Sequence, residues 1–378
     1  MTVAPFAEPI YVTRPLLPAL DSFRDRLGEI WEAGWLTNAG EQHERLTRAI
    51  RDYLRVPEVS LFNNGTIALL AAMRTLGIRG EVITTPFTFP ATPHAITWSG
   101  ASPVFADIDP IRLTLDPARV EDAITARTTG ILAVHVYGIP CDVAGLQAVA
   151  DRHGLKLVYD AAHAFGASIN GVGIGNFGDV SMFSFHATKL FHSAEGGALT
   201  CGSAERRLAI DQVKNFGILN QEQVGPVGIN GKMTELQAAL GLAVLDCVPQ
   251  ELRRRQAIIE RYRERLSGID GLTIVTEPTG VESSRQYFVV RIDSRAFGWS
   301  RDVVFDRLKQ YNVFARKYFY PLCTDYECYR DLPSSSPGLL PVANEAVRQV
   351  LCLPLYGELP LTAVDIICTI IEDVHRLG

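Results

Sequence analysis

The feature that most constrains the fold is a regular alternation of short apolar runs with helical stretches from about residue 59. The runs VSLFN, EVITTPFTF and ILAVHVYG each precede a helical stretch, and LKLVYD and DVSMFSF follow them. This alternation is typical of an α/β fold in which helices cover a largely parallel sheet. In such sheets ligands bind at the carboxyl ends of the strands. The residues expected there are Asn64 to Thr66, Phe87 to Phe89, Asp160 and Ser184 to Lys189.

The pattern changes after about residue 243, where VPQELRRRQAIIERYRERLSG predicts a long surface helix. Beyond it, LTIVTE, QYFVVRID, a helix near residues 301–310 and an apolar C-terminal helix indicate a smaller α+β unit. The chain is long enough for two such units. We therefore expect a large α/β domain over residues 1–245 and a small C-terminal α+β domain over residues 246–378.

Composition excludes several classes of protein. A formal net charge of -6 argues against a nucleic-acid partner, which requires a concentrated basic face. No apolar run approaches membrane-spanning length, and the first twenty residues do not resemble a signal peptide. The seven scattered cysteines form no CxxC pair and are expected to be reduced thiols in a cytoplasmic protein. The histidines form no cluster with metal-ligand spacing, so no metal site is expected.

The stretch GIGNFG at residues 173–178 fits the GxGxxG pattern but lacks its context. A dinucleotide fingerprint follows a strand and opens a helix. Here the stretch follows an Asn170-Gly171 hairpin signal and leads into another strand. We therefore do not expect a dinucleotide site.

Lys189 is one of only six lysines in a chain with thirty arginines, and its neighbours are compact and apolar. Burial at the end of a strand would lower the pKa of its amine and free it for reaction. A free amine condenses with an aldehyde to form a Schiff base. Taken alone, a lone lysine is more often a surface charge.

Asp160 ends the apolar run KLVYD, 29 residues before Lys189. A buried carboxylate needs a partner, and a pyridinium nitrogen is a suitable one, because the carboxylate keeps that nitrogen protonated. The alternative is a helix cap for the AAHAF stretch that follows.

A third group of residues could hold a phosphate and a flat ring. The turn FNNGTIALL joins a strand to a helix N-terminus, and its backbone N–H groups, with the hydroxyls of Thr66 and Ser184, could bind a phosphate. Phe89 could stack on a ring, and His163 could reach a phenolic oxygen. Ordinary structural roles remain open for each residue. Together, an aldehyde, a ring nitrogen, a phosphate and a flat face describe pyridoxal 5′-phosphate.

The sequence resembles a known family at this point. The motifs NGTIAL, PFTFPAT, DIDP, VHVYG, YDAAHAFGA, SFHATKLFHSAEGG and GINGKMTELQAALG are similar to those of the DegT/DnrJ/StrS-type sugar-nucleotide aminotransferases. The resemblance extends from about residue 34 to about residue 360. It implies the aspartate aminotransferase-type fold (fold type I), pyridoxal 5′-phosphate as cofactor, and a homodimer whose active sites lie at the subunit interface.

The resemblance also assigns expected roles to individual residues. It implies that Lys189, Asp160 and His163 are catalytic, as the Schiff-base lysine, the partner of the ring nitrogen and the neighbour of the ring oxygen. It implies a contact from Asn230 to the phosphate of the partner subunit's cofactor. The remaining expected cofactor contacts are Gly65, Thr66, Ile67, Phe89, Ser184 and His186. The expected contacts to the nucleotide sugar are Arg316 and Tyr318.

Two departures from the family pattern leave the fine specificity open. The family usually has S-x-G-T at the phosphate turn where this chain has NNGT, and Thr47 stands where many members carry a glutamate. Lys189 excludes the dehydratase branch, which replaces that lysine by histidine. The motif SFHATK followed by EGG resembles enzymes that aminate carbon 4 of 4-keto-6-deoxy sugars. This favours dTDP-4-keto-6-deoxyglucose as substrate and L-glutamate as amino donor.

Alternative functions stay open from the sequence. An aminotransferase could act at carbon 3 of a nucleotide keto sugar or on a cyclitol ketone, and a lyase could use the same cofactor. A non-catalytic cofactor-binding regulator would usually carry a helix-turn-helix segment, and none is found. The stereochemistry of the new amine, the nucleotide and the pathway, whether a secondary metabolite or a cell-surface glycan, are not fixed by the sequence.

Overall fold

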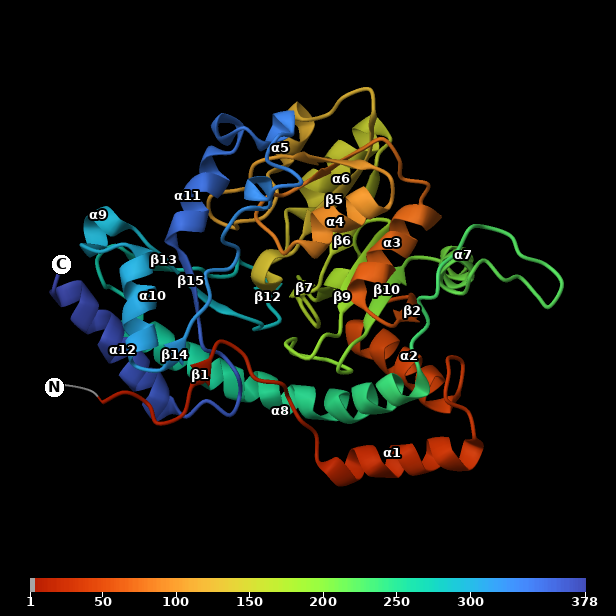
Figure 1. Cartoon of the computed structure of the whole chain (residues 1–378), viewed down its shortest axis with the longest axis horizontal. Helices are drawn as coiled ribbons and strands as arrows, with labels where there is room; N and C mark the ends of the chain where they lie inside the picture. The colour runs from red at the N-terminus through yellow and green to blue at the C-terminus, as the bar shows by residue number, and fades with distance from the viewer. Residues whose placement is uncertain (1–3) are drawn as a thin grey trace.

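A computed structural model of the chain describes residues 4–378; residues 1–3, which begin the expected large domain, lie outside the described part. A seven-stranded sheet forms the centre of the larger part of the molecule (Figure 1). Its strands, in spatial order, are β2 (Glu58–Phe62), β10 (Gly197–Cys201), β9 (Val180–Ser184), β6 (Lys156–Asp160), β5 (Thr128–Val134), β3 (Glu81–Thr84) and β4 (Ser102–Phe105).

The expected parallel sheet is confirmed over most of its width. Strands β9, β6, β5, β3 and β4 pair in parallel, while β10 is antiparallel to both of its neighbours. Helices cover both faces of the sheet, so the side chains of the strands are buried on either side. This is why the strands are continuous apolar runs in the sequence. The helices of this part are α2 (Glu41–Leu54), α3 (Gly65–Thr75), α4 (Ala91–Trp98), α5 (Pro117–Asp122), α6 (Val143–His153) and α7 (Ala204–Lys214).

The C-terminal part is built on a three-stranded antiparallel sheet in the order β11, β13, β15. The strands are β11 (Leu272–Ile274), β13 (Phe288–Ile292) and β15 (Val350–Leu353). The helices are α9 (Ser294–Phe297), α10 (Arg301–Gln310), α11 (Pro341–Gln349) and α12 (Leu361–Arg376). The chain start returns to this part, because β1 (Ile10–Tyr11) pairs in parallel with β14 (Val313–Phe314).

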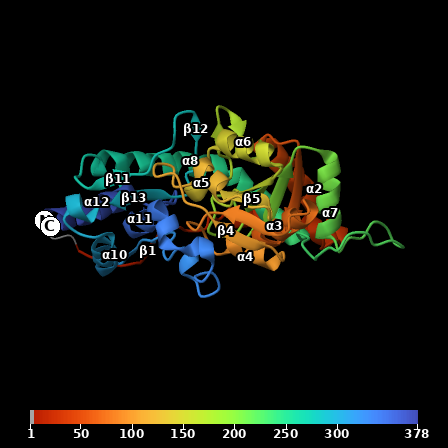
Figure 2. The ribbon, with the colours of Figure 1, turned by 90° about the horizontal axis from the view of Figure 1, so that it is seen from above.

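One helix, α8 (Glu235–Leu266), runs beneath both parts, with α1 (Leu20–Ala33) alongside it (Figure 1). Seen from above, α8 again extends from the large sheet toward α12 (Figure 2). The expected boundary between residues 245 and 246 falls inside α8, so this helix belongs to both expected domains. The division of the chain into two domains stays a prediction.

The stretch GIGNFG leads from β8 (Val172–Gly173) through a short 3₁₀ turn, Ile174–Asn176, into strand β9 and does not open an α-helix. Strands β7 (Ser168–Ile169) and β8 pair across a two-residue turn, and Asn170 and Gly171 both have positive φ angles, of 49° and 79°. This is the hairpin that the Asn-Gly signal predicts. The short strand β12 (Val281–Glu282) pairs antiparallel with β7, so the chain between β11 and β13 joins this hairpin in a separate three-stranded sheet.

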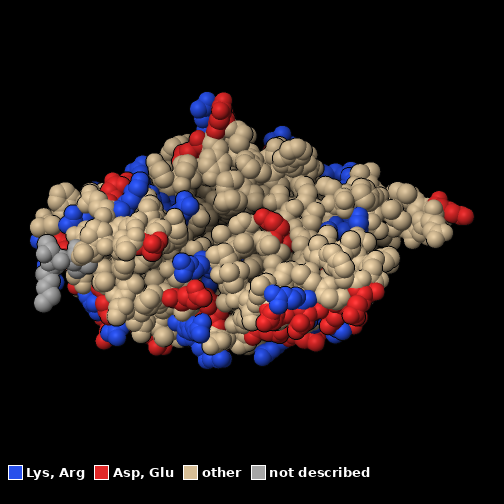
Figure 3. All heavy atoms as spheres, turned by 60° about the horizontal axis from the view of Figure 1, so that its bottom comes forward, with Lys and Arg blue, Asp and Glu red and all other residues tan. Residues whose placement is uncertain are grey.

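Charges are mixed on the molecular surface seen in Figure 3. Blue and red side chains are scattered over a largely tan face, red ones gather along its lower right edge, and no continuous basic stripe is seen on this face. Among residues 4–378, no helix combines the length and apolar character that a membrane crossing requires.

The start of α2 depends on a carboxylate supplied by α8. The N-cap residue of α2 is Gly40, which has no side chain to offer. The buried Glu235 instead accepts hydrogen bonds from the backbone N–H groups of Gln42, at 2.9 Å, and His43, at 2.7 Å. Such bonds satisfy donors that a helix N-terminus leaves unpaired.

We expect Glu235→Ala to lower the free energy of unfolding by about 2 kcal/mol, because two buried donors lose a charged acceptor. Urea denaturation followed by circular dichroism measures the change. Glu32→Ala, on an exposed position of α1, is the matched control and should change it by less than about 0.5 kcal/mol. An equal loss in both variants would contradict this role for Glu235.

Candidate active site

A cavity of about 620 Å³ lies at the carboxyl ends of β6 and β9, where the sequence places the candidate residues. A volume of this size suits a cofactor or a small substrate. The expected site residues that line it are Gly65, Thr66, Ile67, Phe89, Asp160, His163, Ser184, His186, Lys189 and Tyr318, together with Asn64 of the phosphate turn. The parallel topology thus brings together residues that lie far apart in the sequence.

Lys189 and Asp160 influence each other's charge in this cavity. Lys189 follows β9 on an irregular turn, is partly buried, and lines the cavity. Desolvation lowers the pKa of the Lys189 amine to about 8, while the negative charge of Asp160 opposes that shift. Desolvation raises the pKa of the buried Asp160 carboxyl group, and its hydrogen bonds and Lys189 counteract the rise. A lysine with such a pKa has a substantial neutral, nucleophilic fraction at neutral pH.

Two hydrogen bonds hold the Asp160 carboxylate in place. Oδ1 accepts from the backbone N–H of Ala162 at 3.0 Å, and Oδ2 accepts from the Thr92 hydroxyl at 2.8 Å. Thr92 is itself bonded to Thr88 at 3.0 Å. Thr88 lies within the range Phe87 to Phe89 that was expected at this sheet edge, whereas Thr92 and the bonds of both threonines were not predicted. The signal that could have found them is the run of hydroxyl residues in PFTFPATP, since a buried carboxylate at a strand end needs donors.

The alternative of a helix cap does not describe Asp160. No helix begins at this residue, and the bond to Ala162 spans a turn that follows β6. The carboxylate therefore faces the cavity from a strand end, with acceptor capacity left for a further donor.

The phosphate turn has the geometry of an anion site. Asn64 is the N-cap of α3, and its side chain accepts a hydrogen bond from Ile67 N–H at 2.8 Å. Gly65 packs closely against β9, because a Cβ at this position would lie 3.0 Å from the Met182 sulfur and 3.2 Å from Ser184 Cβ. The glycine therefore lets the start of α3, with its positive dipole end, approach the Ser184 hydroxyl.

The walls of the cavity are aromatic. Phe89 leaves 55% of its surface exposed and lines one side. The buried His163 ring stacks on Phe319, with centroids 5.6 Å apart, and meets Tyr287 edge-on at 5.3 Å. Desolvation holds the pKa of His163 well below its ordinary value, so the ring is neutral. Its Nδ1 is buried without a hydrogen-bond partner among the described residues. Tyr287 and Phe319 were not predicted from the sequence.

Two of the expected residues lie away from the cavity lining. Arg316 is exposed and does not line the cavity. Burial raises the pKa of the neighbouring Tyr318, and the positive charge of Arg316 partly opposes that rise. Asn230 is exposed near the phosphate turn, where its side-chain oxygen accepts a hydrogen bond from Lys232 at 2.8 Å and its carbonyl accepts one from Asn63. The expected roles of both residues stay predictions.

The donor set fits pyridoxal 5′-phosphate. An amine, a carboxylate with spare acceptor capacity, an unpaired buried imidazole nitrogen and a glycine-lined helix start face one cavity. These groups match the aldehyde, the ring nitrogen, the ring oxygen and the phosphate of that cofactor.

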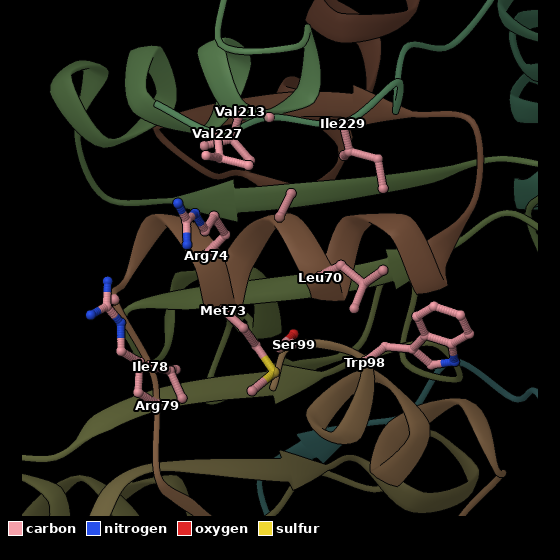
Figure 4. A pocket seen from close by; sticks show the side chains of 13 residues that line it. Leu70, Met73, Arg74, Ile78, Arg79, Trp98, Ser99, Val213, Val227 and Ile229 are labelled. Carbon is pink, nitrogen blue, oxygen red and sulfur yellow. The ribbon is translucent and has the colours of Figure 1, made fainter. Parts of the chain in front are cut away.

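A second cavity, of about 280 Å³, lies at the other end of α3 (Figure 4). In this view Arg74, Arg79 and Ile78 lie on one side of the cavity, Trp98 lies on the opposite side, and Met73 lies between them. Its lining includes Leu70, Ala71, Met73 and Arg74 from the second half of α3, whereas the phosphate turn lies at the start of that helix. None of the residues expected in the site lines it.

Comparison with known proteins agrees with this geometry. The DegT/DnrJ/EryC1/StrS aminotransferase family matches residues 20–372. The dTDP-4-amino-4,6-dideoxy-D-glucose transaminase of Shigella dysenteriae is 43% identical over 368 residues, which is 97% of this chain and 99% of that protein. The crystal structure of DesI in the presence of its TDP-sugar product has a TM-score of 0.94 at 35% identity and covers 99% of this chain and 95% of that one. The PLP-form of the putative sugar aminotransferase Spr1654 from Streptococcus pneumoniae has a TM-score of 0.88 at 26% identity, over 97% and 99% of the two chains.

In the cofactor-free protein, we expect Lys189 to react with trinitrobenzenesulfonate with half-maximal labelling near pH 8. Only the neutral amine reacts, so the labelling curve follows the pKa. Asp160→Asn should move the midpoint to lower pH, because the negative charge that raises the pKa of Lys189 is removed. Peptide mass spectrometry assigns the label to Lys189.

Asp270→Asn is the control for this experiment, since Asp270 is exposed beyond the end of α8. It should leave the midpoint unchanged. A midpoint near 10.5 in the unmodified protein, or one that Asp160→Asn raises, would contradict the electrostatic description of the site.

Proposed function

Since the chain belongs to the DegT/DnrJ/EryC1/StrS aminotransferase family, whose members are dependent on pyridoxal 5′-phosphate, we propose that it transfers an amino group from L-glutamate to a nucleotide-linked keto sugar. The proposed acceptor is dTDP-4-keto-6-deoxyglucose, and the product is a dTDP-4-amino-4,6-dideoxy sugar. The observation that carries the proposal is the single cavity in which Lys189, Asp160 and the start of α3 face the same space. The similarity over nearly the whole length to a transaminase named for this sugar supports the choice of substrate.

Each residue has a defined task in this proposal. When bound, pyridoxal 5′-phosphate supplies an electron sink for the negative charge that develops at the α-carbon of the amino donor. Lys189 Nζ would take the proton from that carbon and deliver it to the carbon of the former aldehyde group, a task suited to an amine with a pKa of about 8. Asp160 keeps a negative charge beside the ring nitrogen, and its bonds to Thr92 and Ala162 fix its direction. The neutral His163 offers a nitrogen to the ring oxygen.

The phosphate and the sugar nucleotide need other groups. Gly65, Thr66 and Ser184 would hold the cofactor's phosphate at the start of α3. The acceptor's diphosphate meets a protein of net charge -6, so local cations must bind it. Arg316 is exposed two residues from Tyr318, which lines the cavity, and is our candidate for that contact.

We also propose that the protein is a homodimer with active sites at the subunit interface. The loop between α7 and α8 extends away from the rest of the molecule (Figure 1). It exposes 41–71% of the surface of five apolar residues: Phe216, Ile218, Leu219, Val224 and Val227. An exposed apolar set of this kind is typical of a protein–protein contact. Asn230 lies at the base of the same loop, and we propose that it reaches the active site of the neighbouring subunit.

A cytoplasmic location is part of the same proposal. All seven cysteines are free thiols in the structure, and five of them are buried. Reduced thiols are typical of proteins in reducing compartments.

Incubation with glutamate and a panel of dTDP, UDP and GDP keto sugars tests the proposed substrate. We expect 2-oxoglutarate to form in a one-to-one ratio with a dTDP-4-amino sugar identified by NMR. Lys189→Ala should reduce the rate by a factor of about 10³ or more, because the proton-transfer group is lost. Amination of 3-keto sugars alone would contradict the proposed position of the reaction.

Subunit complementation tests the shared site. One subunit carries Lys189→Ala and the other Asn230→Asp, which would place a negative charge against the phosphate. If Asn230 serves the partner's site, the mixed dimer contains one site with both residues intact, and activity returns to about half of the value per dimer of the unmodified protein. Each variant alone should have little activity. Failure of the mixture to exceed the two parents would show that Asn230 acts within its own subunit or not at all.

A further inference from the structure

Gln286 holds the backbone on both sides of Lys189. Its side-chain oxygen accepts a hydrogen bond from Leu190 N–H at 2.7 Å, and its side-chain nitrogen donates to the Thr188 carbonyl at 3.0 Å. The side chain is buried, with 2% of its surface exposed. One amide group therefore bonds to the peptide group that precedes Lys189 and to the one that follows it.

This arrangement constrains the direction of the lysine side chain. Peptide groups are planar, so the only soft rotations between the two bonded groups are φ and ψ of Lys189 itself. A single amide that spans both planes fixes these two angles. The backbone N–H of Lys189 also donates to the His186 carbonyl at 2.9 Å, within a segment that forms neither helix nor strand. The Cα–Cβ bond of Lys189 is thereby aimed at the cavity.

The segment that carries Gln286 is anchored to α8. It joins β12 to β13, so it passes between the large sheet and the C-terminal part (Figure 1). The carbonyl of Arg285 accepts a hydrogen bond from Arg255 at 3.1 Å. Arg255 is 1% exposed and pairs with the buried Glu251 at 2.6 Å on the same helix. Through these contacts the amide of Gln286 has a rigid support.

The same segment contacts a second residue of the site. The Ser284 hydroxyl donates a hydrogen bond to the His163 carbonyl. Tyr287 lines the cavity and meets the His163 ring edge-on. Residues 284–287 thus contact the elements that carry Lys189 and His163 while Gln286 itself does not line the cavity.

We propose that Gln286 is a positioning residue for the reaction, which locks the backbone at Lys189 and keeps the amine directed at the reacting atoms. The proposal rests on the transaminase function proposed above. The residue acts through Lys189 and contacts neither the cofactor nor the substrate. A purely structural residue would affect stability alone, whereas Gln286 should affect the chemistry of one particular amine.

Gln286→Met tests the proposal, because methionine has a similar length but neither hydrogen bond. In the cofactor-free protein, we expect the midpoint pH for labelling of Lys189 by trinitrobenzenesulfonate to rise, since the released side chain can reach water. In the loaded enzyme, the rate of the half-reaction with glutamate should fall at least tenfold, with less than a threefold change in the KM for glutamate. The side chain in Gln286→Asn is too short to span both peptide groups, so this variant should also raise the labelling midpoint and slow the half-reaction. It decides the test if the methionine variant does not fold.

Gln256→Met is the matched control. Gln256 lies on α8 and accepts a hydrogen bond from Arg285 at 2.7 Å, so it contacts the same segment without touching the lysine turn. It should leave the labelling curve of Lys189 and the half-reaction unchanged. Unchanged labelling in the folded Gln286 variants, or an equal effect in the Gln256 variant, would overturn the proposal. Because the labelling uses cofactor-free protein, it gives the same answer whether or not the enzyme aminates the proposed sugar.

Discussion

The structure of the site depends on keeping one amine and one carboxylate inside the same desolvated cavity. Burial disfavours both charges, and each charge partly compensates the other. The balance leaves Lys189 with a pKa of about 8, close enough to neutrality for its amine to exchange protons during a reaction. Thr92 and the backbone at Ala162 supply the hydrogen bonds that a buried carboxylate requires. The remaining features of the fold can be understood as the support of this pair.

That support comes from both parts of the chain. The parallel strands β6 and β9 deliver Asp160 and Ser184 to the same edge of the sheet, and Gly65 allows the start of α3 to approach them. The C-terminal part contributes through the segment before β13, which holds the lysine turn with Gln286 and the His163 carbonyl with Ser284. The long helix α8 lies beneath both parts and anchors that segment with a buried ion pair. These contacts from both parts of the chain leave the reacting groups of the cavity little conformational freedom.

The sequence predicted the elements of the site better than the contacts between them. Alternating apolar runs identify the parallel sheet, and a topology of this kind places strand ends together, so Asp160, Ser184 and Lys189 could be grouped from the sequence alone. Gln286, Thr92 and Tyr287 were not found, because their partners lie between 68 and 124 residues away and no local pattern marks such pairs. The antiparallel β10 was missed for a similar reason, because its direction is set by pairing with β2 and β9. The start of α8 at Glu235 was also missed, although it has a local signal, the capping box between Thr234 and Gln237. Arg316 is the opposite case. The family resemblance predicted that it contacts the substrate, but in the structure its side chain does not line the cavity.

The most direct test of the central claim is a crystal structure of the protein with pyridoxal 5′-phosphate bound. We predict that the ring nitrogen contacts the carboxylate of Asp160, that the phosphate lies at the start of α3 beside Ser184, and that Lys189 Nζ is joined to the carbon of the former aldehyde. A ring bound in another cavity, or an Asp160 carboxylate directed away from the ring nitrogen, would contradict the claim that this amine and this carboxylate form one site.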